Sequence, residues 1–393
     1  MSRAVLFLLT IAVGVVAANL YYAQPLVREI SEALGIDPAA AGLVVTLTQI
    51  GYGLGVLFAV PLVDLIENRR LILSMLSIAI FGLLGLIFAD QALPYFAAAF
   101  ATGLGTSTVQ ILVPYAAHFA SEERRGQVVG SMMSGLMIGI MLSRPLSSFM
   151  TSFFGWHAIF MLSAALMTIL ALALRALLPE RRPASLGLRY PSLLASMWTL
   201  LKTTPALRER AFYQGCLFGA FCLFWTAVPL YLAGPDFGLS QTGIAVFALA
   251  GVSGAVAAPF AGRMADRGHT RRATWIALGA GAFSFVIGHH FNDGLIVERG
   301  SSLALMGLLA AAILLDAGVS AHLVLGQRTI FMLPAHTRGR LNGLYIAIIF
   351  IGGAAGSTLG AWAYARGGWE LTSWAGLTLP ALALLIYAFR RKT

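Results

Sequence analysis

The segment GRMADRGHTRR, residues 262–272, separates two long apolar stretches, and in it an acid is followed after five and six residues by two arginines. The segment VPLVDLIENRR, residues 60–70, has the same spacing 202 residues earlier. The residues that share this pattern are Asp64, Arg69, Arg70, Asp266, Arg271 and Arg272. A repeat of this kind indicates a chain built from two similar halves.

A second pair of anchors supports the repeat. The sequence Arg-Gly at 125–126 returns at 338–339, and Phe-Gly-Trp at 154–156 corresponds to Gly-Gly-Trp at 367–369, each shifted by 213 residues. The longest charged segment lies between the halves and contains a helical apolar pattern from Leu193 to Leu201. We therefore predict an N-terminal bundle over 1–178, a cytoplasmic linker with an amphipathic helix over 179–210, and a C-terminal bundle over 211–393.

The composition excludes a water-soluble fold. Only 11% of the 393 residues are Asp, Glu, Lys or Arg, whereas soluble domains average about 25%. Apolar residues make up 59% of the chain, and a soluble protein could not cover so many of them with polar groups. The chain is therefore expected to be embedded in a lipid bilayer.

Charges mark the membrane spans because a charge at the bilayer centre costs at least about 2.5 kcal/mol. The charge-free stretches near or above the ~20 residues of a spanning helix are 4–27, 38–63, 71–89, 91–121, 211–235, 237–262, 273–292, 341–365 and 371–389. Residues 126–174, whose one charge is Arg144, fit two helices hinged near 154–156, and residues 300–327 fit one more. We predict an all-α integral membrane fold of twelve transmembrane helices in two pseudo-symmetric six-helix bundles.

The basic residues predict the orientation. Of 26 Lys and Arg, 21 lie in loops on the side of both termini, three lie on the other side, and Arg144 and Arg328 lie within spans. Since basic loops stay inside, we expect a multi-pass protein of the cell inner (plasma) membrane with both termini cytoplasmic. The basic residues are spread over every inner loop, so we expect no nucleic-acid partner.

Twelve spans in two related halves, a long central loop and a repeated acidic-basic turn resemble the major facilitator superfamily of secondary transporters. The resemblance covers nearly the whole chain and is greatest to the bacterial drug and sugar efflux branch, through residues 19–25 and the glycines of 352–360. It implies alternating access, proton antiport and a conformational latch at Asp64, Asp266 and their arginines. We thus expect proton-coupled efflux of a small amphipathic organic compound: a drug, a sugar or a metabolite.

The fifth span departs from the exporter pattern of this family. Gly135 and Gly139 are present, but Ile140 replaces the family's proline, and Ser143 and Arg144 replace its final glycines. With Arg144 in the cavity, an alternative is proton-coupled uptake of an anionic metabolite.

Asp316 is the one acidic residue predicted inside a span. An acid near the middle of a membrane can be neutral in one transport state and ionised in another, which proton coupling requires. The alternative is a structural ion pair with Arg144 or Arg328. His322 is the other group in this span that titrates near neutral pH, and it is our second candidate for proton coupling.

The resemblance implies that the first, fourth, seventh and tenth spans line a central cavity, and these spans carry most of the polar residues. The side chains expected to bind substrate, with Arg144 from the fifth span, are Asn19, Tyr22, Gln24, Gln110, Arg144, Gln214, Phe218, Phe221, Trp225, Ser320 and Gln327. Four of them, from Gln214 to Trp225, form a mostly aromatic stripe suited to an amphipathic substrate. The same stripe also fits bulky side chains that face lipid.

A minor alternative is copper transport. Met133, Met137 and Met141 recur every four residues, and His157 precedes Met161 by the same spacing. Thioethers and imidazole are Cu(I) ligands, but Met also replaces Leu on apolar helices, so we assign no metal site. No nucleotide-binding loop or nucleophile motif is present. We expect a monomeric transporter without cofactors, not an enzyme, whose partners are a small-molecule substrate, protons and the bilayer.

Overall fold

The computed structural model describes residues 3–183, 189–334 and 337–389, apart from the side chains of residues 3, 123 and 125. The middle of the predicted linker and the last residues of the predicted C-terminal bundle, with the basic residues Arg390, Arg391 and Lys392, lie outside this part. The described residues are almost entirely helical.

The first group of helices precedes the linker. Its helices are α1 (Arg3–Ala18), α2 (Val27–Leu34), α3 (Leu43–Leu54), α4 (Asn68–Phe88), α5 (Ala92–Thr106), α6 (Val109–His118), α7 (Glu122–Phe154) and α8 (His157–Leu177). Short 3-10 turns, Gln24–Leu26 and Pro38–Ala40, precede α2 and α3, and a π-helical turn, Gly55–Ala59, and a 3-10 turn, Val60–Asp64, follow α3. Within this group α1 packs on α7, α5 packs on both α3 and α4, and α4 also packs on α8.

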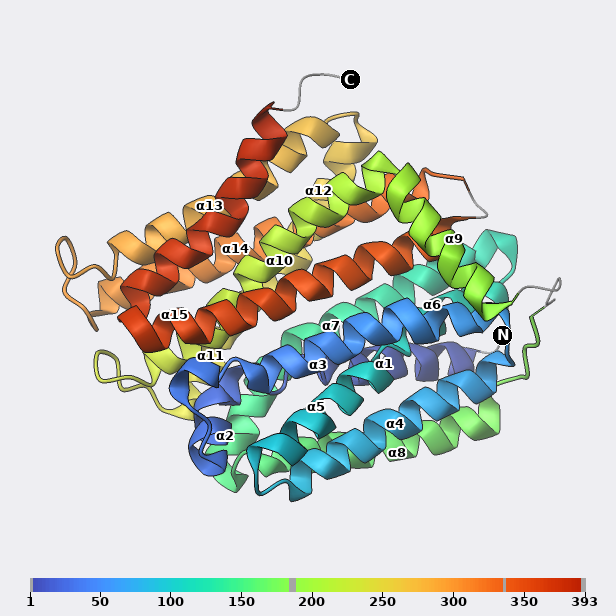
Figure 1. The fold of residues 1–393 in the computed structure, drawn as a ribbon, viewed down its shortest axis with the longest axis horizontal. Coiled ribbons are helices and arrows are strands. Elements are labelled where there is room, and N and C mark those ends of the chain that lie inside the picture. The colour runs from blue at the N-terminus through green and yellow to red at the C-terminus, as the bar shows by residue number, and fades with distance from the viewer. Residues whose placement is uncertain (1–2, 184–188, 335–336, 390–393) are drawn as a thin grey trace.

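The second group follows the linker. Its elements are α9 (Tyr190–Thr203), α10 (Pro205–Leu232), α11 (Gln241–Ala248), the 3-10 turn Leu249–Val252, α12 (Ser253–Asp266), α13 (Thr270–His290), α14 (Ser302–Phe331) and α15 (Arg338–Phe389). Here α10 packs on α15, and α14 packs on both α12 and α13. The two groups lie one above the other in Figure 1.

The structure confirms the predicted twelve-helix membrane fold. Within the described residues, nine helical stretches are long and apolar enough to cross a membrane. One of them, α15, contains Gly367 and Gly368 in non-helical conformations and is therefore two helices. The shorter α1 and the more polar α13 complete the set of twelve.

The two predicted hinges have a common backbone cause. Gly155, between α7 and α8, has φ +77°, and Gly368, inside α15, has φ +58°. Positive φ values are accessible to glycine at little cost, so the chain can reverse there. The matching Phe-Gly-Trp and Gly-Gly-Trp sequences thus mark the same turn in each half.

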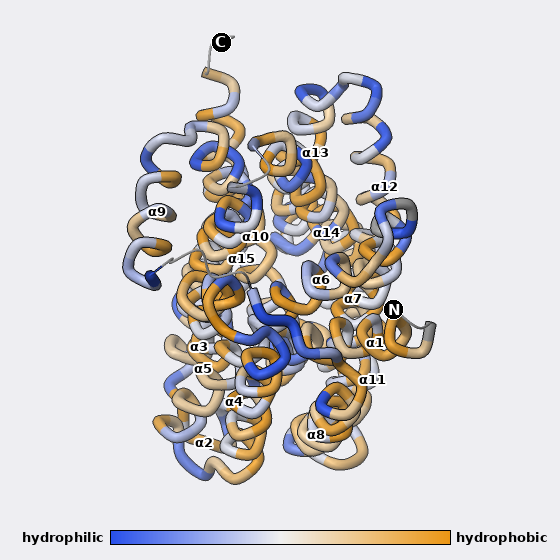
Figure 2. Tube along the Cα trace, turned by 90° about the vertical axis from the view of Figure 1, so that its right-hand side faces the viewer, coloured by the Kyte–Doolittle hydropathy of each residue, from blue (hydrophilic) through white to orange (hydrophobic). Residues whose placement is uncertain are grey.

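We name the two ends of the helix bundle by their helices. At the α9 end lie α9, the 60–70 turn and the 262–272 turn; at the α2 end lie α2 and the start of α11 (Figure 1). The predicted linker helix is present as α9, with Leu193 and Met197 buried and Trp198 59% exposed. Figure 2, viewed from the α9 end, shows hydrophilic turns joining largely hydrophobic helices.

Candidate functional site

A cavity of about 140 Å³ lies between the two groups of helices. Its polar lining consists of Tyr21, Tyr52, Gln110, Arg144, Gln214, Asp316, Ser320 and Gln327. Its apolar lining includes Met133, Leu136, Met137, Ile140, Met141, Phe218, Phe221 and Leu323. An apolar pocket with a few polar groups is typical of a small-molecule site, and this volume holds several water molecules.

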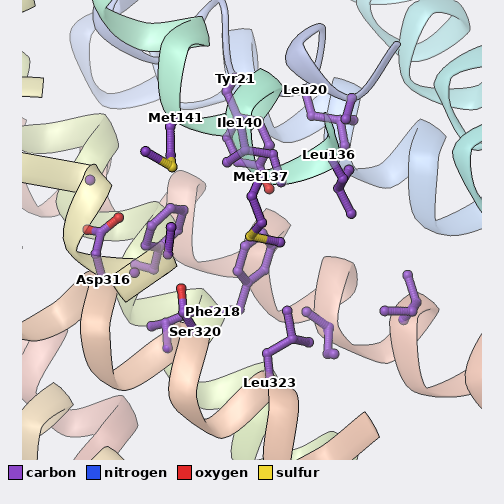
Figure 3. A pocket seen from close by; sticks show the side chains of 18 of the residues that line it. Leu20, Tyr21, Leu136, Met137, Ile140, Met141, Phe218, Asp316, Ser320 and Leu323 are labelled. Carbon is purple, nitrogen blue, oxygen red and sulfur yellow. The ribbon is translucent and has the colours of Figure 1, made fainter. Parts of the chain in front are cut away.

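Helix periodicity brings residues distant in sequence to this cavity. Figure 3 shows Met137 and Met141 pointing from α7 into the space that Asp316, Ser320 and Leu323 face from α14. The cavity extends from the middle of α14, at Asp316, towards its α9 end, where Gln327 lies. The predicted face of Asp316, Ser320 and Gln327 is therefore present, and it lines the cavity.

One charge pair lies at the deep end of the cavity. Arg144 and Asp316 are both buried, and Nη1 of Arg144 lies 3.9 Å from Oδ1 of Asp316. The Nε group of Arg144 donates a hydrogen bond of 2.7 Å to Oε1 of Gln24, and Nε1 of Trp225 donates one of 2.9 Å to Oδ2 of Asp316. The pair and its two hydrogen-bond partners were all predicted from the sequence, and they come from four different helical segments.

Three aromatic rings surround the Arg144 guanidinium. Its central carbon lies 5.2 Å from the ring centre of Tyr21, 4.8 Å from that of Phe221 and 4.4 Å from that of Trp225. Each ring attracts the cation through its quadrupole. Phe221 also stacks on Phe218, with 5.4 Å between ring centres, so the aromatic stripe of α10 faces the cavity and not lipid.

Two glycines that were not predicted from the sequence, Gly251 and Gly254, form the part of the cavity wall beside the Arg144–Asp316 pair. A Cβ atom at Gly251 would lie 3.1 Å from Nη1 of Arg144 and 3.3 Å from Oδ1 of Asp316. A Cβ atom at Gly254 would overlap the hydroxyl of Ser320. The sequence offered one signal for these glycines, the spacing of small residues in the eighth span. Such spacing is common in membrane helices because it allows close packing, so it does not by itself indicate a binding site.

His322 lies behind the cavity wall. It is fully buried, its Nδ1 atom is 2.7 Å from Oε1 of Gln214, and Gln214 donates to the Val319 carbonyl. Of these residues Gln214 and Val319 line the cavity, whereas His322 does not. His322 therefore reaches the cavity only through Gln214.

Two predicted binding residues lie elsewhere. Asn19 accepts a hydrogen bond from Ser163 in the interior of the first helix group, and Tyr22 packs in the core of that group. The adjacent Tyr21 lines the cavity instead. The reason is that α1 ends at Ala18, so helical spacing does not extend to the residues that follow.

Trp225 and Gln24 contact the charge pair from outside the cavity lining, and Gln110 donates to the Tyr52 hydroxyl in the lining.

The described residues do not bring the predicted copper ligands together. Met133, Met137 and Met141 do line the cavity, but His157 stacks on Trp156 and is absent from the cavity lining. Among the described residues, no group of three or more His, Cys, Asp or Glu side chains could hold a metal ion. The methionines line the cavity together with Leu136 and Ile140.

The repeated acidic-basic turns make contacts within their own halves. Asp266 forms an ion pair with Arg328 at the end of α14, rather than with Arg271 or Arg272. In the first copy Asp64 is exposed, and Glu67, not singled out from sequence, accepts hydrogen bonds from the backbone N–H groups at the start of α4. Burial raises the pKa of Glu67, but the backbone N–H groups of residues 69, 70 and 181 outweigh it and hold the pKa below its usual value.

The two helix groups meet closely at the α2 end. Arg28 donates to the carbonyl of Ala233 at 2.8 Å, and Thr46 and Ser357 share a hydrogen bond of 2.7 Å. Gln241 donates to Oε1 of Glu29, while Oε2 of Glu29 is buried without a hydrogen-bond partner in the described part of the chain. Burial raises the pKa of Glu29 above its usual value. We call these contacts the α2-end seam.

Known proteins match this chain in sequence and in structure. The sequence profile described as Major Facilitator Superfamily matches residues 6–297. The uncharacterized transporter YgaY of Escherichia coli O157:H7 is 37% identical over 98% of this chain and 95% of its own length. The probable transporter SCO4007 of Streptomyces coelicolor is 30% identical over 94% of this chain and 83% of its own length.

Solved structures share the fold. A mutant of the nucleoside transporter NupG has a TM-score of 0.77 and 14% identity, covering 98% of this chain and all of that one. A POT family transporter in complex with a thioalcohol-conjugated peptide has a TM-score of 0.75 and 14% identity, covering 98% of this chain and 95% of that one. At this identity the likeness concerns the fold alone.

Proposed function

This chain belongs to the Major Facilitator Superfamily and is a multi-pass membrane transporter, and we propose that it couples transport to protons by alternating access. The observation that carries the proposal is Asp316, a buried carboxylate at the cavity whose nearest cation, Arg144, lies beyond hydrogen-bond distance. Taking up or releasing one proton there changes the charge of the site between the two helix groups. That change can favour one arrangement of the groups over the other.

The orientation of the transporter follows from its charges. Because 21 of 26 basic residues lie at the α9 end or in loops assigned to the same side, we place this end in the cytoplasm of an inner-membrane protein. The cavity then extends towards the cytoplasm while the α2-end seam is closed. In the other state the Asp64 and Asp266 turns would act as the latch, so they are expected to change partners during transport.

Two forms of coupling fit this site. In the first, a proton and an amphipathic organic compound exclude each other, and the compound is exported in exchange for protons. The stacked Phe218 and Phe221 rings favour such a substrate, as does the resemblance to efflux carriers. In the second, an anionic metabolite enters together with a proton. The observation that favours this form is Nη2 of Arg144, which is buried without an acceptor in the described residues.

Proton movement during transport distinguishes the forms. Purified protein would be reconstituted in liposomes that enclose a pH-sensitive dye, and a compound that stabilises the protein in a thermal screen would be added outside at equal pH. Exchange makes the lumen alkaline as the compound enters, whereas co-transport makes it acidic. Entry of the compound without any protein-dependent change of luminal pH would contradict proton coupling. Liposomes with the Asp316→Asn variant are the matched control.

A further inference from the structure

Two buried hydrogen-bond donors lie side by side without acceptors. Nη2 of Arg144 and Nε2 of Gln24 are both buried and unpartnered among the described residues. The two side chains are joined by the 2.7 Å hydrogen bond from Nε of Arg144 to Oε1 of Gln24, which holds their remaining donors close together. Buried donors without acceptors are costly, and Arg144 lines the cavity whereas Gln24 does not, so a ligand in the cavity that brings acceptor oxygens would satisfy Arg144.

The Arg144 cation does not depend on Asp316 for its position. Gln24 and the rings of Tyr21, Phe221 and Trp225 contact the guanidinium whatever the charge of Asp316. With Asp316 ionised the site is neutral overall, and with Asp316 protonated it carries one positive charge. The other titratable side chains facing Arg144 are the Tyr21 phenol and the Cys222 thiol, and both groups are ordinarily neutral near pH 7. An anion is therefore attracted only when Asp316 holds a proton.

The rest of the cavity selects the body of the ligand. Leu136, Met137, Ile140 and Leu323 form apolar walls, and the stacked Phe218 ring offers an aromatic face. The cavity measures about 140 Å³, so the ligand is small. Among the described residues that line the cavity, Arg144 alone is cationic and most of the wall is apolar, so a single anionic group on an apolar body fits best.

We propose that the substrate is a small apolar or aromatic monocarboxylate whose carboxylate binds the Arg144 guanidinium when Asp316 is protonated, with Gln24 holding that guanidinium from behind the cavity lining. Proton and anion then bind together and cross as a neutral pair. The inference rests on the proposed function, in its co-transport form. Arg144 determines specificity, Gln24 positions its guanidinium, and Asp316 links the affinity to pH.

Matched probes test the charge requirement. Phenylacetate, hexanoate and 4-phenylbutyrate would be compared with the amide and the amine of 4-phenylbutyrate for thermal stabilisation of the purified full-length protein at pH 6 and pH 8, where the carboxylates stay ionised. At least one carboxylate should stabilise the protein, and its amide and amine should not. Its affinity should rise by up to roughly tenfold per pH unit of acidification, the limit for one linked proton. Stabilisation by none of the carboxylates, or equally by the amide or amine, would overturn the inference.

Variants test which residues are responsible for carboxylate binding and for its pH dependence. Asp316→Asn should bind the carboxylate with the same affinity at both pH values, and Arg144→Gln should lose binding. Since Arg144→Gln removes a buried group and could fail to fold, Gln24→Leu serves as a second variant and should weaken carboxylate binding by about tenfold, the loss of one hydrogen bond to a charged group. Unchanged binding in a folded Arg144→Gln or Gln24→Leu protein would refute the assignment.

Failure of this inference is distinct from failure of proton coupling. Carboxylate binding that needs Arg144 but does not vary with pH would support the anion site and contradict the role of Asp316 in coupling. Proton movement driven by an uncharged or cationic compound would keep the coupling and remove the anion site.

Discussion

Nη1 of Arg144 and Oδ1 of Asp316 lie 3.9 Å apart, an ion pair without a direct hydrogen bond. Charged hydrogen bonds between such groups are usually about 2.7–2.9 Å long. Each partner instead makes its shorter hydrogen bond elsewhere, Arg144 to Gln24 and Asp316 to Trp225. The two charges can therefore separate without either side chain losing its position, as a coupling site requires and a structural ion pair does not.

The first prediction concerns the stability of this pair. Breaking a buried ion pair typically costs about 3–5 kcal/mol because one charge is left uncompensated. For Asp316→Asn we expect a smaller loss, below about 3 kcal/mol, because Gln24 and three aromatic rings still hold Arg144. Denaturant unfolding of the purified Asp316→Asn, Arg144→Gln and doubly substituted proteins measures this. An Asp316→Asn protein that folds only when Arg144→Gln is added would mean that the acid serves mainly to neutralise the arginine.

The second prediction concerns the glycine wall. A methyl group at Gly251 would contact both members of the charge pair, at 3.1 Å from Arg144 and 3.3 Å from Asp316. Overpacking of this kind costs about 1–3 kcal/mol, and because the methyl group displaces the proposed substrate-binding pair itself, we expect Gly251→Ala to lower substrate affinity by about tenfold. Gly279→Ala is the matched control, since an added Cβ there meets no atom within 4 Å. If Gly251→Ala and Gly279→Ala bound the substrate with equal affinity in a titration, the placement of Gly251 against the charge pair would be wrong.

The third prediction is a pH dependence of the α2-end seam. Burial raises the pKa of Glu29, so the closed seam binds more protons than a state in which Glu29 is in water. By linkage, acidification through the range between the two pKa values favours the closed seam, and higher pH opens it. The charged groups nearby are Arg28, which lowers the pKa, and Glu32, which raises it.

Spin labels at the exposed positions Ala33, in α2, and Leu295, in the loop between α13 and α14, belong to different helix groups and can follow this opening by their separation. The distance should increase as the pH rises in the wild-type background, whereas Glu29→Gln should hold the short distance at all pH values because it cannot ionise. Glu32→Gln, which alters an exposed carboxylate on the same helix, should leave the pH dependence in place. The same pH response in Glu29→Gln would assign the seam's titration to another group.

The sequence predicted the features that depend on local pattern. Charge-free stretches located the helices, including the break between 365 and 371 where Gly368 lies, and the length of the 126–174 stretch predicted the hinge at Gly155. The sequence placed Arg144, Asp316 and Arg328 within spans and left open which arginine Asp316 faces; the structure places Asp316 beside Arg144.

Features that depend on how helices meet could not be predicted. The end of α1 at Ala18, where the Asn19 side chain donates to the carbonyls of Val15 and Val16, shifts the cavity contact from Tyr22 to Tyr21. Asp266 was expected to act with its neighbouring arginines but pairs with Arg328, 62 residues away. The Gly251 wall arises because a glycine lets another helix's side chains approach, and the sequence alone does not say which side chains those are.

Transport by Asp316→Asn tests the account most directly. With a compound that stabilises both wild-type and Asp316→Asn proteins, liposomes would be assayed for accumulation driven by an imposed pH gradient and for counterflow, the exchange of labelled for unlabelled compound without a gradient. We predict that Asp316→Asn loses gradient-driven accumulation and keeps counterflow, because the amide retains size and hydrogen bonding but carries no exchangeable acidic proton. Asp316→Glu should accumulate the compound partially. Accumulation by Asp316→Asn equal to that of the wild type would contradict coupling through Asp316 and would direct attention to His322.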